Sequence, residues 1–245
     1  MSTIKPFKAL RPHAQLAKQV ASKPYDVLTS AEAKIEAQGN PGSFLHITKS
    51  EIDLPENTDP HSIEVYERAK ENLDAFLKRE VLFKENKDCY YLYKLQMNSR
   101  SQTGLVCISS LEDYANGIIK KHEYTRPEKE MDRIQHIKAT DAQTGNVFLA
   151  YRNVKTLDDL VEKVTAVKSS VYDFIAEDGV QHTLWIVNDS ENIEKITQIF
   201  AESVPCTYIA DGHHRAASAA KVFEESGKNV SPEAGCFWTT LFPSG

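Results

Sequence analysis

A short stretch around residue 210 constrains the fold more than any other part of the chain. A β-prone apolar run at residues 207–209 is followed by Asp211 and Gly212. Residues 216–223 (AASAAKVF) come soon after and are rich in strong helix formers. We therefore predict a strand, a glycine turn and the start of a helix in direct succession.

The predicted turn carries side chains suited to binding phosphate. A helix start leaves backbone N–H groups unpaired, and the helix dipole favours an anion beside them. Gly212 allows close approach to the backbone, Arg215 can bind two phosphate oxygens at once, and Asp211 offers an oxygen ligand for Mg²⁺. Together with His213 and His214, these residues predict a polyphosphate site that is neither of the Walker nor of the Rossmann type.

Two other interpretations of this turn stay open. An Asp-Gly pair is an ordinary turn signal, and adjacent histidines can cap a helix without binding a ligand. A zinc site is less favoured, because adjacent histidines point in different directions and no Cys-x-x-Cys or His-x-x-x-His partner lies nearby.

Composition limits the class of protein. The chain has 245 residues, enough for one large or two small domains, and its net charge of −6 gives no overall attraction to nucleic acid or anionic membranes. Four widely spaced cysteines favour buried, reduced thiols over disulfides. No signal peptide and no run of membrane-spanning length is found, so we expect a cytoplasmic protein without nucleic-acid or membrane partners.

Periodicity and capping signals predict the elements of the chain. Before residue 104 we expect a short helix capped by Thr29 or Ser30, a strand at 43–47, and a strand at 89–95. A longer helix is expected with Asp59 as its cap and Pro60 as its first residue, ending near residue 79. Its predicted apolar face consists of Ile63, Tyr66, Ala69, Leu73, Phe76 and Leu77.

Further along the chain, helices and strands mix without regular β-α-β alternation. Capping boxes at Ser110/Asp113 and Thr156/Asp159 predict helices ending at residues 119 and 167. A strand at 104–108, antiparallel to 89–95, and a hairpin of strands 171–176 and 180–187 are expected, as is a helix capped by residue 189 or 190. This order predicts an α+β fold with a mixed sheet and flanking helices.

A second polar cluster lies at residues 120–133. Such a charged run is ordinarily a solvated helix face, but His122 and Glu123 precede Pro127, where we predict that a helix begins, and so should sit on a turn. A carboxylate held there could deprotonate a substrate hydroxyl if the fold brings it to the predicted phosphate site. Within the helix, the residues with spacings that share one face are Lys129, Asp132 and Arg133.

Residues 211–215, followed by an alanine-rich helix, resemble the phosphate-binding corner of the ParB/sulfiredoxin superfamily, and especially its free-serine kinases. In those kinases an Asp-Gly-His-His-Arg segment holds nucleotide phosphates and metal, and a glutamate after a histidine activates the serine hydroxyl; His122 and Glu123 match that pair. Residues 105–109 resemble the superfamily's first strand.

The whole chain is also similar to the family called domain of unknown function 1015. The residues that carry this resemblance lie at 4–12, 24–27 and 40–44, in the two polar clusters, and in the segment Asp178-Gly179-Val180 with His182 and Trp185. Tyr25, Asp26 and His182 are secondary site candidates that fit equally well as packed turn or sheet residues. Members of this family extend beyond the strand at residues 242–243, so we expect the chain to be a C-terminally truncated member.

These resemblances imply an N-terminal α+β region at 1–103 and a ParB/sulfiredoxin-like nucleotide-binding core at 104–245. The implied activity is phosphoryl transfer from ATP (or ADP), with Mg²⁺, to the hydroxyl of free L-serine, giving O-phosphoserine. Glu123 and Asp211 would be catalytic, Asp211 would hold the metal, and residues 212–215 would bind the nucleotide phosphates. Further residues would bind the substrate, namely His122, Lys129, Asp132 and Arg133. A nucleotide-binding regulatory switch without kinase activity is the alternative, and a homodimer is left open.

Overall fold

The computed structural model describes residues 1–227 and 233–244 of the chain. The chain divides into two compact units, each made of separate segments. Unit 1 comprises Met1–Ala9, Glu85–Arg126 and Asn146–Gly245, and unit 2 comprises Leu10–Lys84 and Pro127–Gly145. The boundary expected between residues 103 and 104 falls inside a single strand, β5 (Arg100–Ser110).

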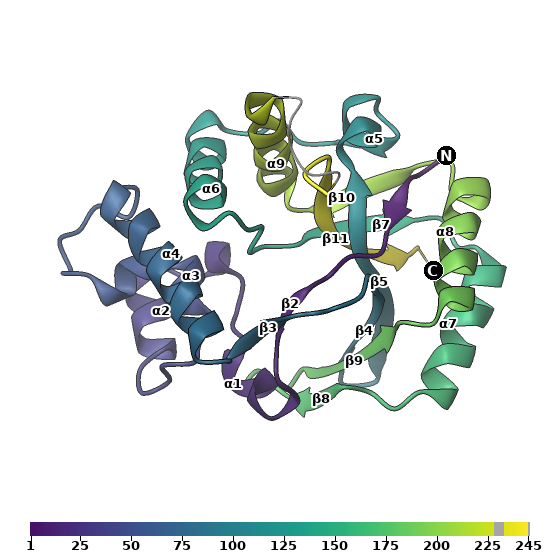
Figure 1. Ribbon diagram of the computed structural model, residues 1–245, viewed down its shortest axis with the longest axis horizontal. Helices are drawn as coiled ribbons and strands as arrows, with labels where there is room; N and C mark the ends of the chain where they lie inside the picture. The colour runs from purple at the N-terminus through teal and green to yellow at the C-terminus, as the bar shows by residue number, and fades with distance from the viewer. Residues whose placement is uncertain (228–232, 245) are drawn as a thin grey trace. The chain divides into compact units, whose positions relative to one another are not determined.

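Unit 1 is built on a mixed sheet of nine strands within the described residues, ordered β6-β10-β7-β11-β5-β4-β9-β8, with β1 paired to β5 (Figure 1). The pairs β10–β6 and β11–β7 are parallel, and the remaining pairs are antiparallel. The expected α+β class with a mixed sheet is therefore confirmed. Besides β5, the strands are β1 (Ile4–Lys5), β4 (Tyr90–Met97), β6 (Ile119–Lys120), β7 (Val147–Tyr151), β8 (Tyr172–Ile175), β9 (Gln181–Val187), β10 (Thr207–Asp211) and β11 (Cys236–Pro243).

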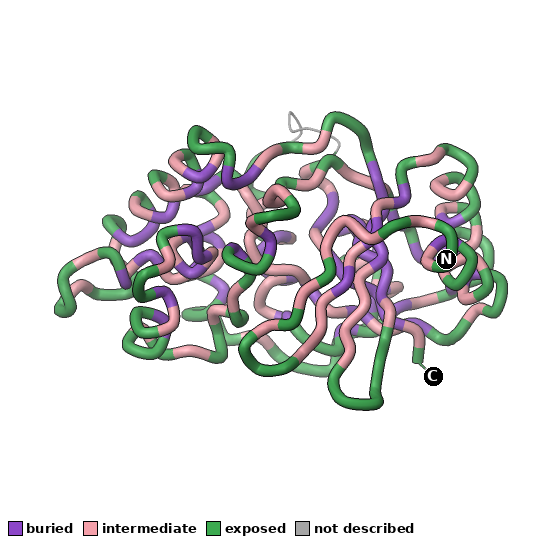
Figure 2. The backbone as a smooth tube through the Cα atoms, turned by 90° about the horizontal axis from the view of Figure 1, so that it is seen from below, coloured by how far each residue is buried: buried purple, intermediate pink, exposed green. Residues whose placement is uncertain are grey.

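Alternating side chains of the central strands fill two apolar layers, because successive residues of a strand point to opposite faces. Tyr90 and Leu92 of β4 enter the larger core, whereas Tyr91 between them enters a smaller cluster on the other face. The buried stretches of the chain run along these strands in Figure 2, and exposed residues gather in the connections. Apolar residues are thus distributed between the two faces with the period of the strand.

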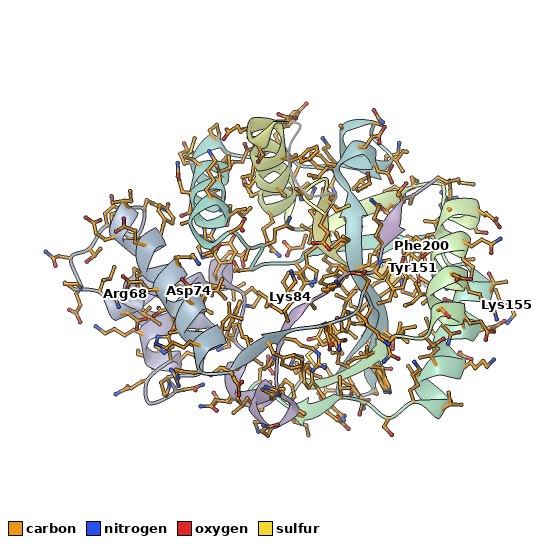
Figure 3. The ribbon with its side chains drawn as sticks, viewed as in Figure 1. Arg68, Asp74, Lys84, Tyr151, Lys155 and Phe200 are labelled. Carbon is orange, nitrogen blue, oxygen red and sulfur yellow. The ribbon has the colours of Figure 1, made fainter. Side chains whose placement is uncertain are left out.

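Among the described residues of unit 1, the helices that contribute to the larger core are α5 (Leu111–Ala115), α7 (Lys155–Val167), α8 (Ser190–Ser203) and α9 (His213–Ser226). In Figure 3, Tyr151 of β7 and Phe200 of α8 lie against each other, with ring centroids 5.3 Å apart, while Lys155 points outward. The helices therefore lie where their apolar stripes reach the sheet.

The predicted caps of these helices are confirmed in part. Asp189 caps α8 by accepting from the Asn192 N–H, and Ser110 caps α5 by accepting from the N–H groups of residues 112 and 113. However, α5 ends at Ala115, because Gly117 adopts a left-handed φ of 71° and the chain turns into β6. The box predicted at Thr156 is wrong, since α7 begins at Lys155 and its cap residue, Val154, makes no side-chain cap.

The predicted hairpins of unit 1 are confirmed. β4 and β5 pair antiparallel, although both strands are longer than expected and leave a tight turn where Asn98 has a positive φ. The strands β8 and β9 pair across the predicted Asp178-Gly179 turn. The extended β4–β5 pairing shows that polar residues at 100–103 do not end a strand when a neighbouring strand supplies hydrogen bonds.

Unit 2 is mainly helical, with a two-stranded sheet of β2 (Leu10–Pro12) and β3 (Leu82–Lys84). Its α-helices are α1 (Ala17–Val20), α2 (Ser30–Glu36), α3 (Leu45–Thr48), α4 (Ile63–Lys78) and α6 (Pro127–Thr140), and its 3₁₀ turns are η1 (Ala14–Leu16), η2 (Tyr25–Val27) and η3 (Ser50–Asp53). The Thr29 cap of α2 is confirmed as a full capping box, and α6 begins at Pro127 as predicted.

Two predictions in unit 2 are wrong. The strand expected at 43–47 is instead the turn leading into α3, where Leu45 and Ile47 are buried by helical packing. The helix expected from Pro60 begins at Ile63, because Asp59 caps a separate turn by accepting from the His61 N–H and Ser62 precedes the helix. Ile63 is consequently 66% exposed, and Val65 takes the buried position on α4.

The four cysteines are free thiols, as expected, with Cys206 half-buried and the other three buried. Burial raises the pKa of Cys107 to about 12, so that thiol stays protonated at neutral pH. Across the described part of the chain, none of the helices has the length and apolar character needed to cross a membrane.

Candidate functional site

The turn between β10 and α9 has the predicted strand–glycine–helix geometry. Gly212 is the N-terminal cap residue of α9 and adopts a left-handed conformation with φ 93°. A Cβ added there would lie 3.3 Å from the Cα of Val147 and 3.3 Å from the Arg215 guanidinium carbon. The first intrahelical bond runs from the Ala216 N–H to the Gly212 carbonyl at 3.0 Å, so the amides before it are left for other acceptors.

His213 is the buried side chain of this turn, with 5% of its surface exposed. Its Nδ1 lies 3.7 Å from a carboxylate oxygen of Glu123, and the His122 ring meets it edge-on with centroids 4.5 Å apart. Within the described residues its Nε2 is buried without a hydrogen-bond partner. Burial, followed by the neighbouring His122, lowers the pKa of His213, which favours the neutral imidazole.

His214 connects the same turn to the loop that precedes α6. Its Nε2 accepts a hydrogen bond from the backbone N–H of Arg126 at 3.0 Å. In the neutral ring the proton is therefore on Nδ1. Residues 122–126 are thus anchored beside the start of α9 by a side chain of the predicted phosphate site.

Arg215 and Asp211 are paired with each other. The Arg215 guanidinium donates to a carboxylate oxygen of Asp211 at 2.7 Å and also to the backbone carbonyl of Asn146. The Arg215 side chain is 12% exposed, whereas the Asp211 side chain is 65% exposed. The arginine therefore holds Asp211 at the end of β10, and its own contact with phosphate stays a prediction.

Glu123 is the exposed member of the cluster, with 58% of its side chain accessible. It lies in the irregular segment between β6 and α6, as predicted for a residue ahead of Pro127. The structure therefore brings together His122, Glu123 and the 211–215 segment, which are the two parts of the site that belong to unit 1. We call this group the α9 cluster.

The three remaining candidates lie in unit 2 and contact other residues of that unit. Asp132 accepts hydrogen bonds from Arg133, Tyr66 and His61. The Arg133 guanidinium lies 3.9 Å from the ring centre of Tyr25. Lys129 is exposed on the first turn of α6. The role of these three residues in binding substrate stays a prediction.

His182, a secondary candidate, has a packing role in the sheet. Its Nδ1 is 2.5 Å from the Tyr93 hydroxyl, and its ring is stacked between those of Tyr93 and Phe174. Burial lowers the pKa of His182, which keeps the stacked ring neutral.

The donor set of the α9 cluster fits phosphate better than it fits a metal alone. No group of three His, Cys, Asp or Glu side chains suited to a metal ion occurs in residues 1–227 and 233–244. Mg²⁺ is commonly bound by one or two carboxylates together with substrate phosphates and water. Asp211 could therefore supply one ligand to a phosphate-bound Mg²⁺, while the first amides of α9 fit phosphate oxygens.

Some contacts of the cluster carried no signal in the sequence. The Asn146 carbonyl binds Arg215, and the Asn146 side chain donates to Thr240 at 2.6 Å. The Arg126 contact uses a backbone N–H, which every residue except proline has. Neither can be found from residue types or spacing, because both depend on how distant segments pack.

The fold defines the class as an α+β protein with a mixed sheet. The family model described as protein of unknown function (DUF1015) matches residues 4–244. The chain therefore belongs to the DUF1015 family. Neither a curated protein nor a solved structure matches the chain.

Proposed function

We propose that the protein is a kinase that transfers a phosphoryl group from ATP (or ADP) to the hydroxyl of free L-serine. The observation that carries the proposal is the 3.7 Å separation between the Glu123 carboxylate and His213 Nδ1. It places a carboxylate, the residue type that accepts a hydroxyl proton, beside a helix start, the element that binds phosphate. We further propose that the core is ParB/sulfiredoxin-like, on the resemblance of the 211–215 segment.

Residues at the start of α9 have separate parts in the proposed reaction. The first amides of α9, with His213 beside them, would bind the nucleotide phosphates, and Asp211, held by Arg215, would be a ligand of Mg²⁺. Mg²⁺ when bound neutralises the charge of the phosphate oxygens. The backbone amides would stabilise the same negative charge and hold the phosphates in position.

In the proposed reaction, serine gains a phosphoryl group and loses its hydroxyl proton. The serine hydroxyl oxygen forms a bond to the terminal phosphorus, and the bond from that phosphorus to the bridging oxygen of the nucleotide breaks. The hydroxyl proton goes to the Glu123 carboxylate, and the nucleotide leaves with one phosphate fewer. Since Glu123 is 58% exposed, it can release the proton to solvent after each turnover.

The test is an assay of the protein with nucleotide, Mg²⁺ and L-serine, followed by detection of O-phosphoserine and the shortened nucleotide. Glu123→Gln should lower kcat by about 10²- to 10⁴-fold, the usual contribution of a general base, while nucleotide affinity is kept. Glu112→Gln, at an exposed position on α5, is the matched control and should leave kcat unchanged.

Three outcomes are decisive. Serine-dependent turnover that Glu123→Gln abolishes supports the proposal. Full turnover by Glu123→Gln rejects the role of that carboxylate. Nucleotide binding without turnover for serine would support a nucleotide-dependent switch in place of a kinase.

A further inference from the structure

Unit 2 contains a second cluster of titratable side chains, on an open groove between the start of α4 and the first turns of α6. The groove has a volume of about 640 Å³, within the range of small-molecule sites. Its lining includes His61, Tyr66 and Asp132, the charged pair Glu128 and Lys129, and the apolar residues Ile63 and Met131.

The Asp132 carboxylate is fixed by hydrogen bonds and orients the His61 ring. One of its oxygens accepts from the Tyr66 hydroxyl at 2.9 Å and lies 3.1 Å from His61 Nδ1, and the other accepts from Arg133 at 2.9 and 2.6 Å. Burial alone would raise the pKa of Asp132, but the Arg133 charge and the hydrogen bonds lower it. The ionised carboxylate requires a proton on Nδ1, so the neutral ring of His61 carries its lone pair on Nε2.

The His61 ring is open to a ligand. Its side chain is 68% exposed, whereas the Asp132 side chain that positions it is only 15% exposed. A half-buried carboxylate and an oriented, exposed imidazole together form a hydrogen-bond acceptor of fixed direction. Such an acceptor suits an ammonium or hydroxyl donor of a ligand.

The remainder of the groove combines opposite charges with apolar surface. Glu128 and Lys129 are adjacent, exposed and both line it, and neither makes a side-chain ion pair within the described residues. Ile63 is 66% exposed and Met131 is 53% exposed in the same groove. The complementary ligand carries one positive group, one negative group and an apolar substituent.

We propose that this groove binds a free α-amino acid with an apolar side chain. The carboxylate pairs with Lys129, the ammonium group donates to His61 Nε2 beside Glu128, and the side chain covers Ile63 and Met131. The proposal does not depend on the kinase activity, and it assigns Lys129 to an apolar amino acid instead of to serine.

The experiment titrates L-leucine into the full chain and follows the Hε1 resonance of His61 by NMR, assigned with His61→Gln. A saturable shift is expected. Three probes that each lack one group, namely 4-methylpentanoate, L-leucinamide and L-serine, should bind about tenfold or more weakly, because each loses one charged or apolar contact. Absence of a saturable shift up to the solubility limit of leucine overturns the proposal, as does serine binding as tightly as leucine.

Variants separate the carboxylate contact from general effects. Lys129→Gln should weaken leucine binding about tenfold while leucinamide binding stays the same, since leucinamide has no carboxylate. Lys78→Gln, at the C-terminal end of α4, should change neither affinity. Equal leucine affinity for the Lys129→Gln variant and the parent chain overturns the proposal, and an unchanged amide spectrum shows that the variant is folded.

Discussion

The adjacent residues His213 and His214 have different surroundings, although the sequence presents them as a pair. His213 is buried beside Glu123, and its Nε2 has no hydrogen-bond partner among the residues that the structure describes, whereas His214 accepts a backbone hydrogen bond from the loop before α6. Consecutive positions of a helix project about 100° apart, so two neighbouring side chains cannot meet the same group. One histidine therefore lies against Glu123, and the other anchors the loop that carries Glu123.

Gly212→Ala should destabilise the protein by about 1–2 kcal/mol from the left-handed φ alone, with a further loss from the approach to the Val147 backbone. Gly179→Ala is the matched control, because Gly179 has φ 81° but no atom within 4 Å of an added Cβ. Urea unfolding should show the larger loss at Gly212. An equal loss in both variants would show that the contact with Val147 contributes nothing.

His136 should make the stability of unit 2 depend on pH. Burial, followed by the Arg133 charge, lowers the pKa of His136 to about 4, and the neutral ring donates from Nε2 to the Ile47 carbonyl at 2.9 Å. Between about pH 6.5 and 4 the unfolded chain binds a proton there and the folded chain does not, so stability falls as pH falls, by up to about 3 kcal/mol.

The measurement for His136 is urea unfolding at several pH values, compared with His136→Gln, which retains a donor for Ile47. The slope of unfolding free energy against pH between 4 and 6.5 should be smaller in the variant. Identical slopes would mean that folding does not lower the pKa of His136.

At the scale of elements, the predictions that the structure confirms are mostly those made from residues close together in the chain. The caps at Thr29, Ser110 and Asp189 and the β8–β9 turn are present as predicted. Predictions were wrong where tertiary packing outweighed a local sequence pattern. Residues 43–47, for example, have a β-prone sequence but form a turn and α3. A short apolar run does not by itself distinguish a strand from a buried helix.

Gly104 in β5 lies in close contact with side chains of the neighbouring strand β11. A Cβ there would lie 2.8 Å from the Thr240 methyl group and 2.9 Å from the Phe242 ring, and both residues are buried. Gly104→Ala should cost about 1–3 kcal/mol through overpacking. Thr240→Ser removes the methyl group but keeps the hydroxyl that accepts from Asn146.

Urea unfolding of Gly104→Ala, Thr240→Ser and the double variant forms a double-mutant cycle. The double variant should lose less stability than the sum of the single losses, because the serine leaves room for the added Cβ. Strictly additive losses would rule out the contact between positions 104 and 240.

At the scale of the whole molecule, the chain leaves unit 1 after residue 9, returns at 85, leaves again after 126 and returns at 146. Unit 2 is therefore completed by α6, whose buried residues Ile134, His136 and Thr140 come from a segment distant in sequence. A linear division of the chain cannot separate units of this kind.

A fragment of residues 10–84 should lack a cooperative unfolding transition, because it has lost α6 and the residues that α6 buries. The same fragment joined by a long Gly-Ser linker to residues 127–145 should show cooperative unfolding and dispersed NMR signals. Urea unfolding and amide spectra distinguish the two. Cooperative unfolding of 10–84 alone would show that α6 is dispensable for this unit.

The sequence alone determined the strand–glycine–helix turn, most caps and hairpins, the α+β class and the family, because these depend on residues near one another or on a pattern along the whole chain. Only the tertiary structure brought Glu123 to 3.7 Å from His213, paired Arg215 with the Asn146 carbonyl, and joined Asp132 to His61 and Tyr66. Contacts between distant segments follow from how helices and strands pack, and packing depends on shape and buried area that no local residue pattern encodes.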